Sequence, residues 1–124
     1  MATIPVLIID DEQDFAVTLA ERLRLRDFEA RSVGSADEAM ALMQGGWRPA
    51  VAIVDLRMPG LDGIETLSLI KQHDPTIEVI LLTGHGSTTA GIEGMSKGLF
   101  DYLMKPVDIG ELIGKIELAA GKGP

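Results

Sequence analysis

Runs of consecutive apolar residues alternate along the chain with longer stretches in which apolar residues recur every three or four positions. Three runs, residues 4–9, 50–54 and 77–82, are rich in Val, Ile and Leu and show no regular polar alternation. Such a run is typical of a strand that is buried on both faces, as in the middle of a parallel sheet. Residues 28–33 alternate apolar and charged side chains, which predicts a strand near a sheet edge, and residues 100–104 predict a short fifth strand.

The stretches between these strands have the periodicity of amphipathic helices. Phe15, Leu19 and Leu23 recur every four residues and predict a helix over about residues 14–26. Capping-box sequences predict the starts of three further helices: Ser35 to Glu38, Asp62 to Glu65, and Asp108 to Glu111. The first of these three is expected to stop at Gly45-Gly46, since glycine commonly ends a helix.

A fifth helix is expected over about residues 87–97. It contains Gly91 and Gly94, and each glycine costs a helix about 1 kcal/mol relative to alanine. We therefore expect it to be the least rigid helix of the domain.

Five predicted strands thus alternate with five predicted helices. This order predicts an α/β fold, a doubly wound (βα)5 arrangement in which helices cover both faces of a five-stranded parallel sheet. No linker or second domain is visible, so residues 1–124 are expected to form a single domain. Its ordered core should span about residues 3–120, and residues 121–124 should be a tail or a cut point.

Composition narrows the class of partner. The chain has 124 residues, a net charge of −8 and no cysteine, so it can form neither a disulfide nor a thiolate metal site. The acidic balance argues against direct binding of nucleic acid, whose phosphates require clustered Lys and Arg. No apolar run approaches the roughly 18 residues of a membrane span. No signal peptide precedes the first strand, so a cytoplasmic protein without a membrane contact is expected.

Polar residues follow four of the predicted strands, and parallel strands place their carboxyl ends along one edge. These residues are Asp10 and Asp11, Asp55, Thr83, and Lys105. Each has an ordinary explanation alone; Asp, for example, favours the first position of a turn. Together, the three carboxylates suit a hard cation such as Mg²⁺, whereas the hydroxyl and the ammonium suit an anion. The combination suggests phosphoryl transfer to a carboxylate.

Four segments of the chain carry a family resemblance. They are Ile8-Ile-Asp-Asp-Glu12, Val54-Asp-Leu-Arg-Met-Pro-Gly-Leu-Asp-Gly63, Leu82-Thr-Gly-His-Gly86, and Lys97-Gly-Leu-Phe-Asp-Tyr-Leu-Met-Lys-Pro106. In this order and at these spacings they resemble the receiver domains of bacterial two-component response regulators, the CheY-like superfamily. The resemblance covers essentially the whole chain and implies the flavodoxin-like strand order 2-1-3-4-5.

The resemblance also implies a role for each of the clustered residues. Asp55 matches the phosphoacceptor of the family. Asp10 and Asp11 match the acid pair that binds Mg²⁺ together with Asp55 and the main-chain carbonyl of Arg57. Thr83 matches the switch hydroxyl that moves onto the phosphoryl group.

Three further expectations follow from the same resemblance. Lys105 matches the lysine that pairs with the phosphoryl group, and its peptide bond to Pro106 should be cis. Tyr102 matches the aromatic residue that changes between outward and inward rotamers on activation. Gly84 stands where many receivers carry Ala, so water would reach the phosphoryl group more easily.

The resemblance implies partners as well. The phosphoryl donor would be a sensor histidine kinase or a phosphotransfer protein, and an output domain would follow Pro124. The face made by the helix over residues 87–97, the strand over residues 100–104 and the last helix would bind a partner or a second copy of the chain. Beyond accepting a phosphoryl group and slowly losing it, the domain would have no enzymatic turnover.

Three alternatives have the same fold or the same chemistry. A flavin-binding module would need aromatic residues beside its ligand, and only Trp47 and Tyr102 are at hand. A magnesium phosphatase with an aspartyl nucleophile commonly uses Asp-x-Asp, but Arg57 lies two residues after Asp55. A degenerate receiver that only binds partners would have lost part of the polar set, and here no acid or lysine of that set is missing.

Overall fold

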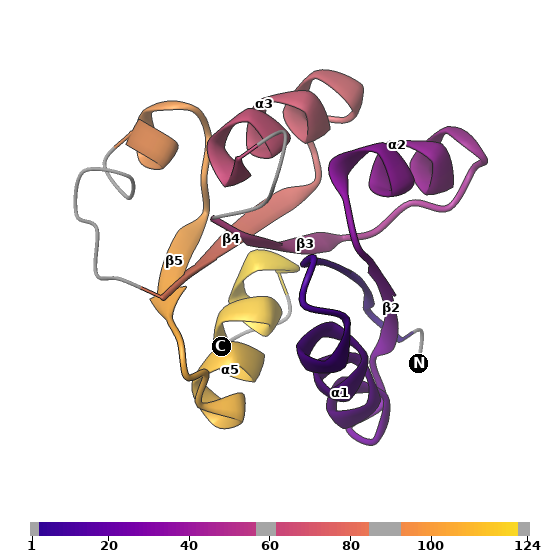
Figure 1. The fold of residues 1–124 in the computed structure, drawn as a ribbon, viewed down its shortest axis with the longest axis vertical. Helices are drawn as coiled ribbons and strands as arrows, with labels where there is room; N and C mark the ends of the chain where they lie inside the picture. Colours follow the sequence, from indigo (N-terminus) through magenta and orange to yellow (C-terminus); the bar gives the residue numbers. More distant parts are fainter. Residues whose placement is uncertain (1–2, 57–61, 85–92, 122–124) are drawn as a thin grey trace.

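The computed structural model describes residues 3–56, 62–84 and 93–121 (Figure 1). Its elements, in chain order, are β1 (Pro5–Ile9), α1 (Gln13–Arg24), β2 (Glu29–Val33), α2 (Ala36–Gln44), β3 (Val51–Asp55), α3 (Gly63–His73), β4 (Glu78–Thr83), β5 (Asp101–Met104) and α5 (Ile109–Ala119). Of the helix expected over residues 87–97, residues 93–96 are helical. Residues 87–92 of the predicted helix, including Gly91, lie outside the described residues.

The five strands form one parallel sheet in the order β2-β1-β3-β4-β5, which confirms the predicted fold class and strand order. Helices α2 and α3 cover one face of this sheet, and α1 and α5 cover the other (Figure 1). The longest described helix is α1, with 12 residues. Within the described part of the chain, no helix has the length and apolar character needed to cross a bilayer.

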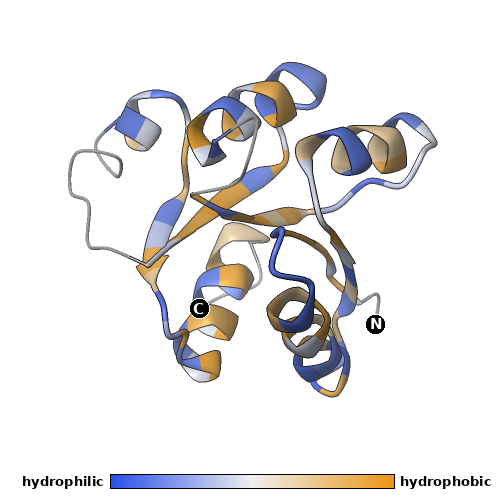
Figure 2. Cartoon of the chain, in the orientation of Figure 1, coloured by the Kyte–Doolittle hydropathy of each residue, from blue (hydrophilic) through white to orange (hydrophobic). Residues whose placement is uncertain are grey.

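Burial on both faces explains why the central strands lack polar alternation. Successive side chains of a strand point to opposite faces. In β1, Val6 and Ile8 pack into the core on the α1 and α5 side, whereas Leu7 and Ile9 pack into the core on the α2 and α3 side. All five residues of β3 are buried as well. Figure 2 shows the largely apolar central strands between helices that carry polar residues on their outer sides.

The helix starts follow the predicted caps. The side chains of Ser35, Asp62 and Asp108 each accept a hydrogen bond from the backbone N–H three residues later. At Asp62 the box is reciprocal, since the Glu65 carboxylate accepts from the Asp62 N–H. At Ser35 the return bond is displaced by one residue, because the Glu38 carboxylate accepts from the N–H of Gly34 instead.

Two predicted boundaries shift because α1 ends in a tight turn. The α-helix stops at Arg24, two residues before the predicted end. Asp27 takes a left-handed conformation, with φ of 69°. Its N–H donates to the Arg24 carbonyl, and the Phe28 N–H donates to the Leu23 carbonyl, which is the hydrogen-bond pattern of a Schellman motif. Phe28 therefore closes the helix instead of opening β2, which starts at Glu29.

Candidate functional site

The polar residues that follow the strands do meet at one edge of the sheet. The pairing register places Ile9 beside Val54, Asp55 beside Leu82, and Thr83 beside Met104. The residues at or just after these strand ends therefore lie side by side. This is the edge at which open α/β sheets bind ligands.

Three carboxylates form a compact acidic cluster at this edge. Asp10, Asp11 and Asp55 each offer one oxygen, and these oxygens lie within 4.8 Å of one another. Asp10 and Asp55 are buried, with 1% and 7% of their surfaces exposed, whereas Asp11 is exposed. The Asp10 carboxylate is oriented by the N–H of Glu12, which donates to its Oδ1 at 2.9 Å. A cluster of hard oxygen donors with one solvent-facing member fits a divalent cation that keeps water ligands.

Lys105 is the cation that this structure places in the cluster. Its Nζ lies 3.0 Å from Asp10 Oδ2 and 3.4 Å from both Asp55 Oδ1 and Glu12 Oε1. Burial alone would lower the pKa of Lys105, but the hydrogen bond to Asp10 and the charges of the three carboxylates outweigh it and raise the pKa above its ordinary value. The side chain is therefore a fixed ammonium ion at neutral pH.

The backbone also holds Lys105 at the edge. Its N–H donates to the Thr83 carbonyl at 2.8 Å, which extends the β4–β5 pairing by one residue. The peptide bond between Lys105 and Pro106 is cis, as the resemblance implied. The lysine thus leaves the sheet at a defined point beside Thr83.

Lys105 also contacts two residues that the sequence analysis did not assign to the site, the acid Glu12 and the aromatic Phe15. The Nζ lies 4.4 Å from the centroid of the Phe15 ring, within the distance of a cation–π interaction. The periodicity of α1 places Phe15 on the buried face, but says nothing of a contact with Lys105. One feature of the sequence could have indicated that Phe15 lies near the site. It falls in the first helical turn after Asp10, Asp11 and Glu12, at the edge where the strands end.

A glycine sets the position of the backbone next to Asp55. The Gly63 N–H donates to the Leu56 carbonyl at 2.8 Å. A Cβ on Gly63 would lie 2.7 Å from Leu56 Cα and 2.8 Å from the Asp55 carbonyl oxygen, distances that real Cβ atoms do not adopt. Only glycine therefore lets the start of α3 pack this closely against the end of β3.

The two expected switch residues lie on neighbouring strands. Thr83, at the end of β4, is buried with 4% of its surface exposed. Tyr102 pairs with Leu81 of β4 and packs, partly buried, against the core on the α2 and α3 side. Arg57, whose carbonyl was expected to bind the metal, lies outside the described residues.

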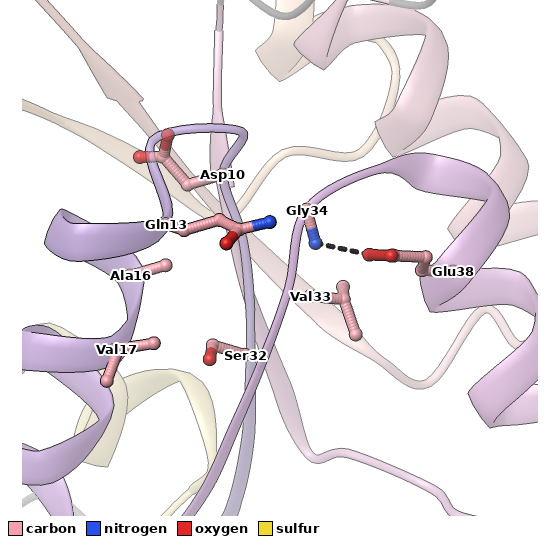
Figure 3. Close-up of a pocket in the computed structure, with 8 residues that line it drawn as sticks. All are labelled: Asp10, Gln13, Ala16, Val17, Ser32, Val33, Gly34 and Glu38. Carbon is pink, nitrogen blue, oxygen red and sulfur yellow. Dashed lines mark hydrogen bonds between the residues drawn. The ribbon is translucent and has the colours of Figure 1, made fainter.

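A polar cavity of about 260 Å³ opens beside Asp10, between the start of α1 and the end of β2 (Figure 3). In Figure 3 the Gln13 side chain extends across it toward Gly34, whose N–H donates to Glu38 at 2.6 Å. Its lining residues are Asp10, Gln13, Ala16, Val17, Ser32, Val33, Gly34 and Glu38. This lining contains no aromatic ring on which a flavin could stack.

Trp47 is not at the site either. Its Nε1–H donates to Glu29 at 2.6 Å and its ring stacks under Arg31 at 4.6 Å. Glu29 pairs with Pro5 at the start of β1, so the indole lies toward the opposite ends of the strands from Asp10. The flavin-binding alternative is therefore not supported.

Comparison with known proteins assigns the family. The family model for the response regulator receiver domain matches residues 6–117. Over 114 residues, 92% of this chain, the sequence is 33% identical to the DNA-binding transcriptional regulator NtrC of Salmonella typhimurium. The match covers 24% of NtrC, and the chain spans about a quarter of the length of the curated relatives it matches.

Solved structures agree with this assignment. A response regulator receiver domain protein from Clostridium thermocellum is 32% identical, with a TM-score of 0.89 over 96% of this chain and 95% of that one. A response regulator protein from Burkholderia pseudomallei, solved with a phosphorylated aspartic acid, calcium ion and citrate, is 27% identical, with a TM-score of 0.85 over 96% and 69% of the two chains. Sequence, fold and the acidic edge of the sheet agree: the chain belongs to the receiver domains of two-component response regulators, which are phosphorylation-controlled signalling switches.

Proposed function

We propose that Asp55 accepts the phosphoryl group and that the donor is a phosphohistidine of a sensor histidine kinase or a phosphotransfer protein. An Asp55 carboxylate oxygen would attack phosphorus while the phosphorus–nitrogen bond of the donor breaks, and the electron pair would return to the imidazole ring. The products are an acyl phosphate on Asp55 and the free histidine. The observation that carries this proposal is the position of Lys105 Nζ, 3.4 Å from Asp55 Oδ1 and 3.0 Å from Asp10 Oδ2.

The acidic cluster is proposed to bind Mg²⁺ through Asp10, Asp11 and Asp55, with the Arg57 carbonyl as a further candidate. The cation would neutralise charge on the phosphoryl oxygens when it is bound. Support comes from the three carboxylate oxygens within 4.8 Å of one another and from the relative that was solved with a phosphorylated aspartic acid and a calcium ion. Lys105, which contacts Asp10 and Asp55, would supply a second positive charge.

The switch is proposed to run from the phosphoryl group into β4 and β5. A phosphoryl group adds up to about two negative charges and three acceptor oxygens, which would attract the Thr83 hydroxyl and the Lys105 ammonium. Tyr102 would then turn inward behind Thr83. The face expected from the helix over residues 87–97, of which residues 93–97 are described, together with β5 and α5, would change and would bind a partner or a second copy of the chain.

The chain as a whole is proposed to act as one cytoplasmic receiver unit without enzymatic turnover beyond gaining and losing its own phosphoryl group. Its curated relatives include transcriptional regulators that are about four times as long. We propose that an output domain C-terminal to Pro124 carries the response.

Acetyl phosphate with Mg²⁺ tests the assignment of Asp55. Intact-mass measurement should find one added phosphate on the wild-type chain and none on Asp55→Asn. Asp14→Asn is the matched control, because Asp14 is an exposed acid of the first turn of α1 and is not part of the cluster. Phosphate retained in Asp55→Asn, or absent from the wild type, would overturn the proposal.

A further inference from the structure

We propose that Phe15 is a positioning residue for Lys105, whose ammonium its ring holds within reach of Asp55. The inference rests on the proposed role of Lys105 in binding the phosphoryl group. It goes beyond that role because it assigns a function to Phe15, a residue outside the polar set at the strand ends. Its effect passes through the lysine alone.

The ring is anchored before it meets the lysine. Phe15 lies in the first turn of α1 and packs, half-buried, against the core on the α1 and α5 side. With Pro106, Val107 and Ile109 it also lines an apolar groove of about 380 Å³ between α1 and the start of α5. A side chain anchored in this way cannot follow Lys105 if the ammonium moves.

The carboxylates of Asp10, Asp55 and Glu12 do not by themselves fix the Lys105 ammonium in one position. Asp10 and Asp55 lie inward, but Glu12 is exposed over 69% of its side chain and attracts the same Nζ from the solvent side at 3.4 Å. The Phe15 ring adds a contact that depends on direction, because a cation is attracted to the face of an aromatic ring. At 4.4 Å from the centroid, the ammonium gains this attraction only while it stays over the ring, next to Asp10.

An aliphatic side chain at position 15 would fill the same space without this attraction. The Lys105 ammonium would then spend more time toward Glu12 and water, and less time within reach of a phosphoryl group on Asp55. A partly exposed cation–π contact of about 1 kcal/mol corresponds to roughly a fivefold effect. Fivefold is therefore the size of the change that we expect in phosphorylation rate.

The first measurement is spectroscopic and needs no phosphorylation. A methylene group beside a ring face has NMR signals shifted upfield by the ring current, so the Lys105 Cε protons should be shifted in the wild type. The shift should disappear in Phe15→Leu and persist in Phe15→Tyr. Phe28→Leu is the matched control, because Phe28 belongs to the same core but lies at the far end of α1; there the Lys105 shift should stay.

The second measurement couples the two residues through a double-mutant cycle. With acetyl phosphate and Mg²⁺, Phe15→Leu should slow phosphorylation about fivefold, and Phe15→Tyr should restore most of the rate. In a Lys105→Met background, Phe15→Leu should change the remaining rate by less than about 1.5-fold. An equal loss in both backgrounds would show that Phe15 acts through the fold and would overturn the proposal.

Binding of Mg²⁺ separates positioning from damage to the site. Phe15→Leu should bind Mg²⁺ at least as tightly as the wild type, because the ring touches the lysine and the lysine competes for Asp10. Weaker Mg²⁺ binding in Phe15→Leu but not in Phe28→Leu would count against the proposal. If the wild type gains no phosphate, the proposed function fails, whereas an unshifted Lys105 signal in the wild type overturns the role of Phe15 on its own.

Discussion

At the scale of single residues, the site holds three carboxylates close together, and their mutual repulsion lowers the stability of the folded state. Asp10, Asp11 and Asp55 share a space less than 5 Å across, and one ammonium, that of Lys105, faces this cluster among the described residues. Asp11 is the exposed member, whereas the carboxylates that contact Lys105 belong to Asp10, Asp55 and Glu12. A bound cation would reduce the repulsion among these carboxylates. A substitution of Asp11 should therefore change both metal binding and the stability that the metal adds.

Magnesium should raise the melting temperature of the wild type, and Asp11→Asn should largely remove this rise. A ligand that binds only the folded state stabilises it by about 2.7 kcal/mol at a hundred times its dissociation constant. Thermal unfolding with increasing Mg²⁺ measures the effect. Asp14→Asn should respond like the wild type, and an equal rise in Asp11→Asn would show that Asp11 is not a ligand.

At the scale of elements, the helix ends carry much of the local specification. Residues in left-handed conformations follow α1, α2 and the helical turn over residues 93–96: Asp27, Gly46 and Gly98. In each case the hydrogen bonds have the Schellman pattern. Two of the three positions use glycine, which takes this conformation without strain, and Asp27 is the exception.

Asp27→Gly should therefore stabilise the domain. Removing the side chain at φ of 69° relieves the left-handed strain, and we expect a gain of about 0.5–1 kcal/mol after the entropy of the glycine is counted. Urea unfolding measures the change. The same substitution at Asp37, inside the first turn of α2, should destabilise instead, and a loss at both positions would contradict this account of the α1 end.

The stability of the turn between α3 and β4 should depend on pH, because the Asp74 carboxylate accepts several hydrogen bonds there. The side-chain hydroxyl and backbone N–H of Thr76 and the Arg48 guanidinium donate to its carboxylate, and the pKa of Asp74 falls well below its usual 3.8. Because the folded-state pKa is lowered, the stability that this carboxylate contributes is complete above about pH 3.8 and is lost as the pH falls below that value.

Asp74→Asn should accordingly be less stable than the wild type at pH 7, and the difference should narrow steadily below pH 3.8. Denaturant unfolding of both proteins across pH 2–7 tests this. The narrowing should be smaller in an Arg48→Met background, which removes one of the groups that stabilise the charged form. A difference that is constant across this pH range would rule out the ionised Asp74 as its source.

At the scale of the whole molecule, β5 and α1, the two elements that flank the site, differ in how deeply they are buried. β5 is a four-residue edge strand that pairs only with β4 among the described strands, and three of its four residues are not fully buried. α1, by contrast, buries four residues in the core. A change at Thr83 and Lys105 should therefore spread into β5 more readily than into α1.

Hydrogen exchange with and without beryllium fluoride, a mimic of the phosphoryl group, tests this asymmetry. We expect the largest change in protection over residues 84–104, a span that includes residues outside the described part, and little change in α1 (Gln13–Arg24). A state-dependent face must already fluctuate without phosphate, because a ligand shifts an equilibrium only by its differential affinity. A change confined to residues 56–63 would mean that the domain binds the phosphoryl group without relaying it.

The sequence by itself determined the local structure and the inventory of reactive groups. Unbroken apolar runs predicted the buried strands, and cap residues predicted the starts of α2, α3 and α5, because both depend on neighbours a few residues apart. The same pattern placed Asp10, Asp55, Thr83 and Lys105 directly after or at the end of strands. With the family resemblance, which supplied the strand order, these residues were sufficient to predict one site.

Only the tertiary structure decided which groups touch. Lys105 reaches Asp10 across 95 positions of sequence, and that contact depends on strand order and register, which local periodicity does not encode. The Phe15 ring under Lys105 and the close approach of Gly63 to Asp55 arise in the same way, from helices packing onto strand ends. Periodicity shows which face of a helix is buried, but the packed fold alone determines which atom each buried side chain meets.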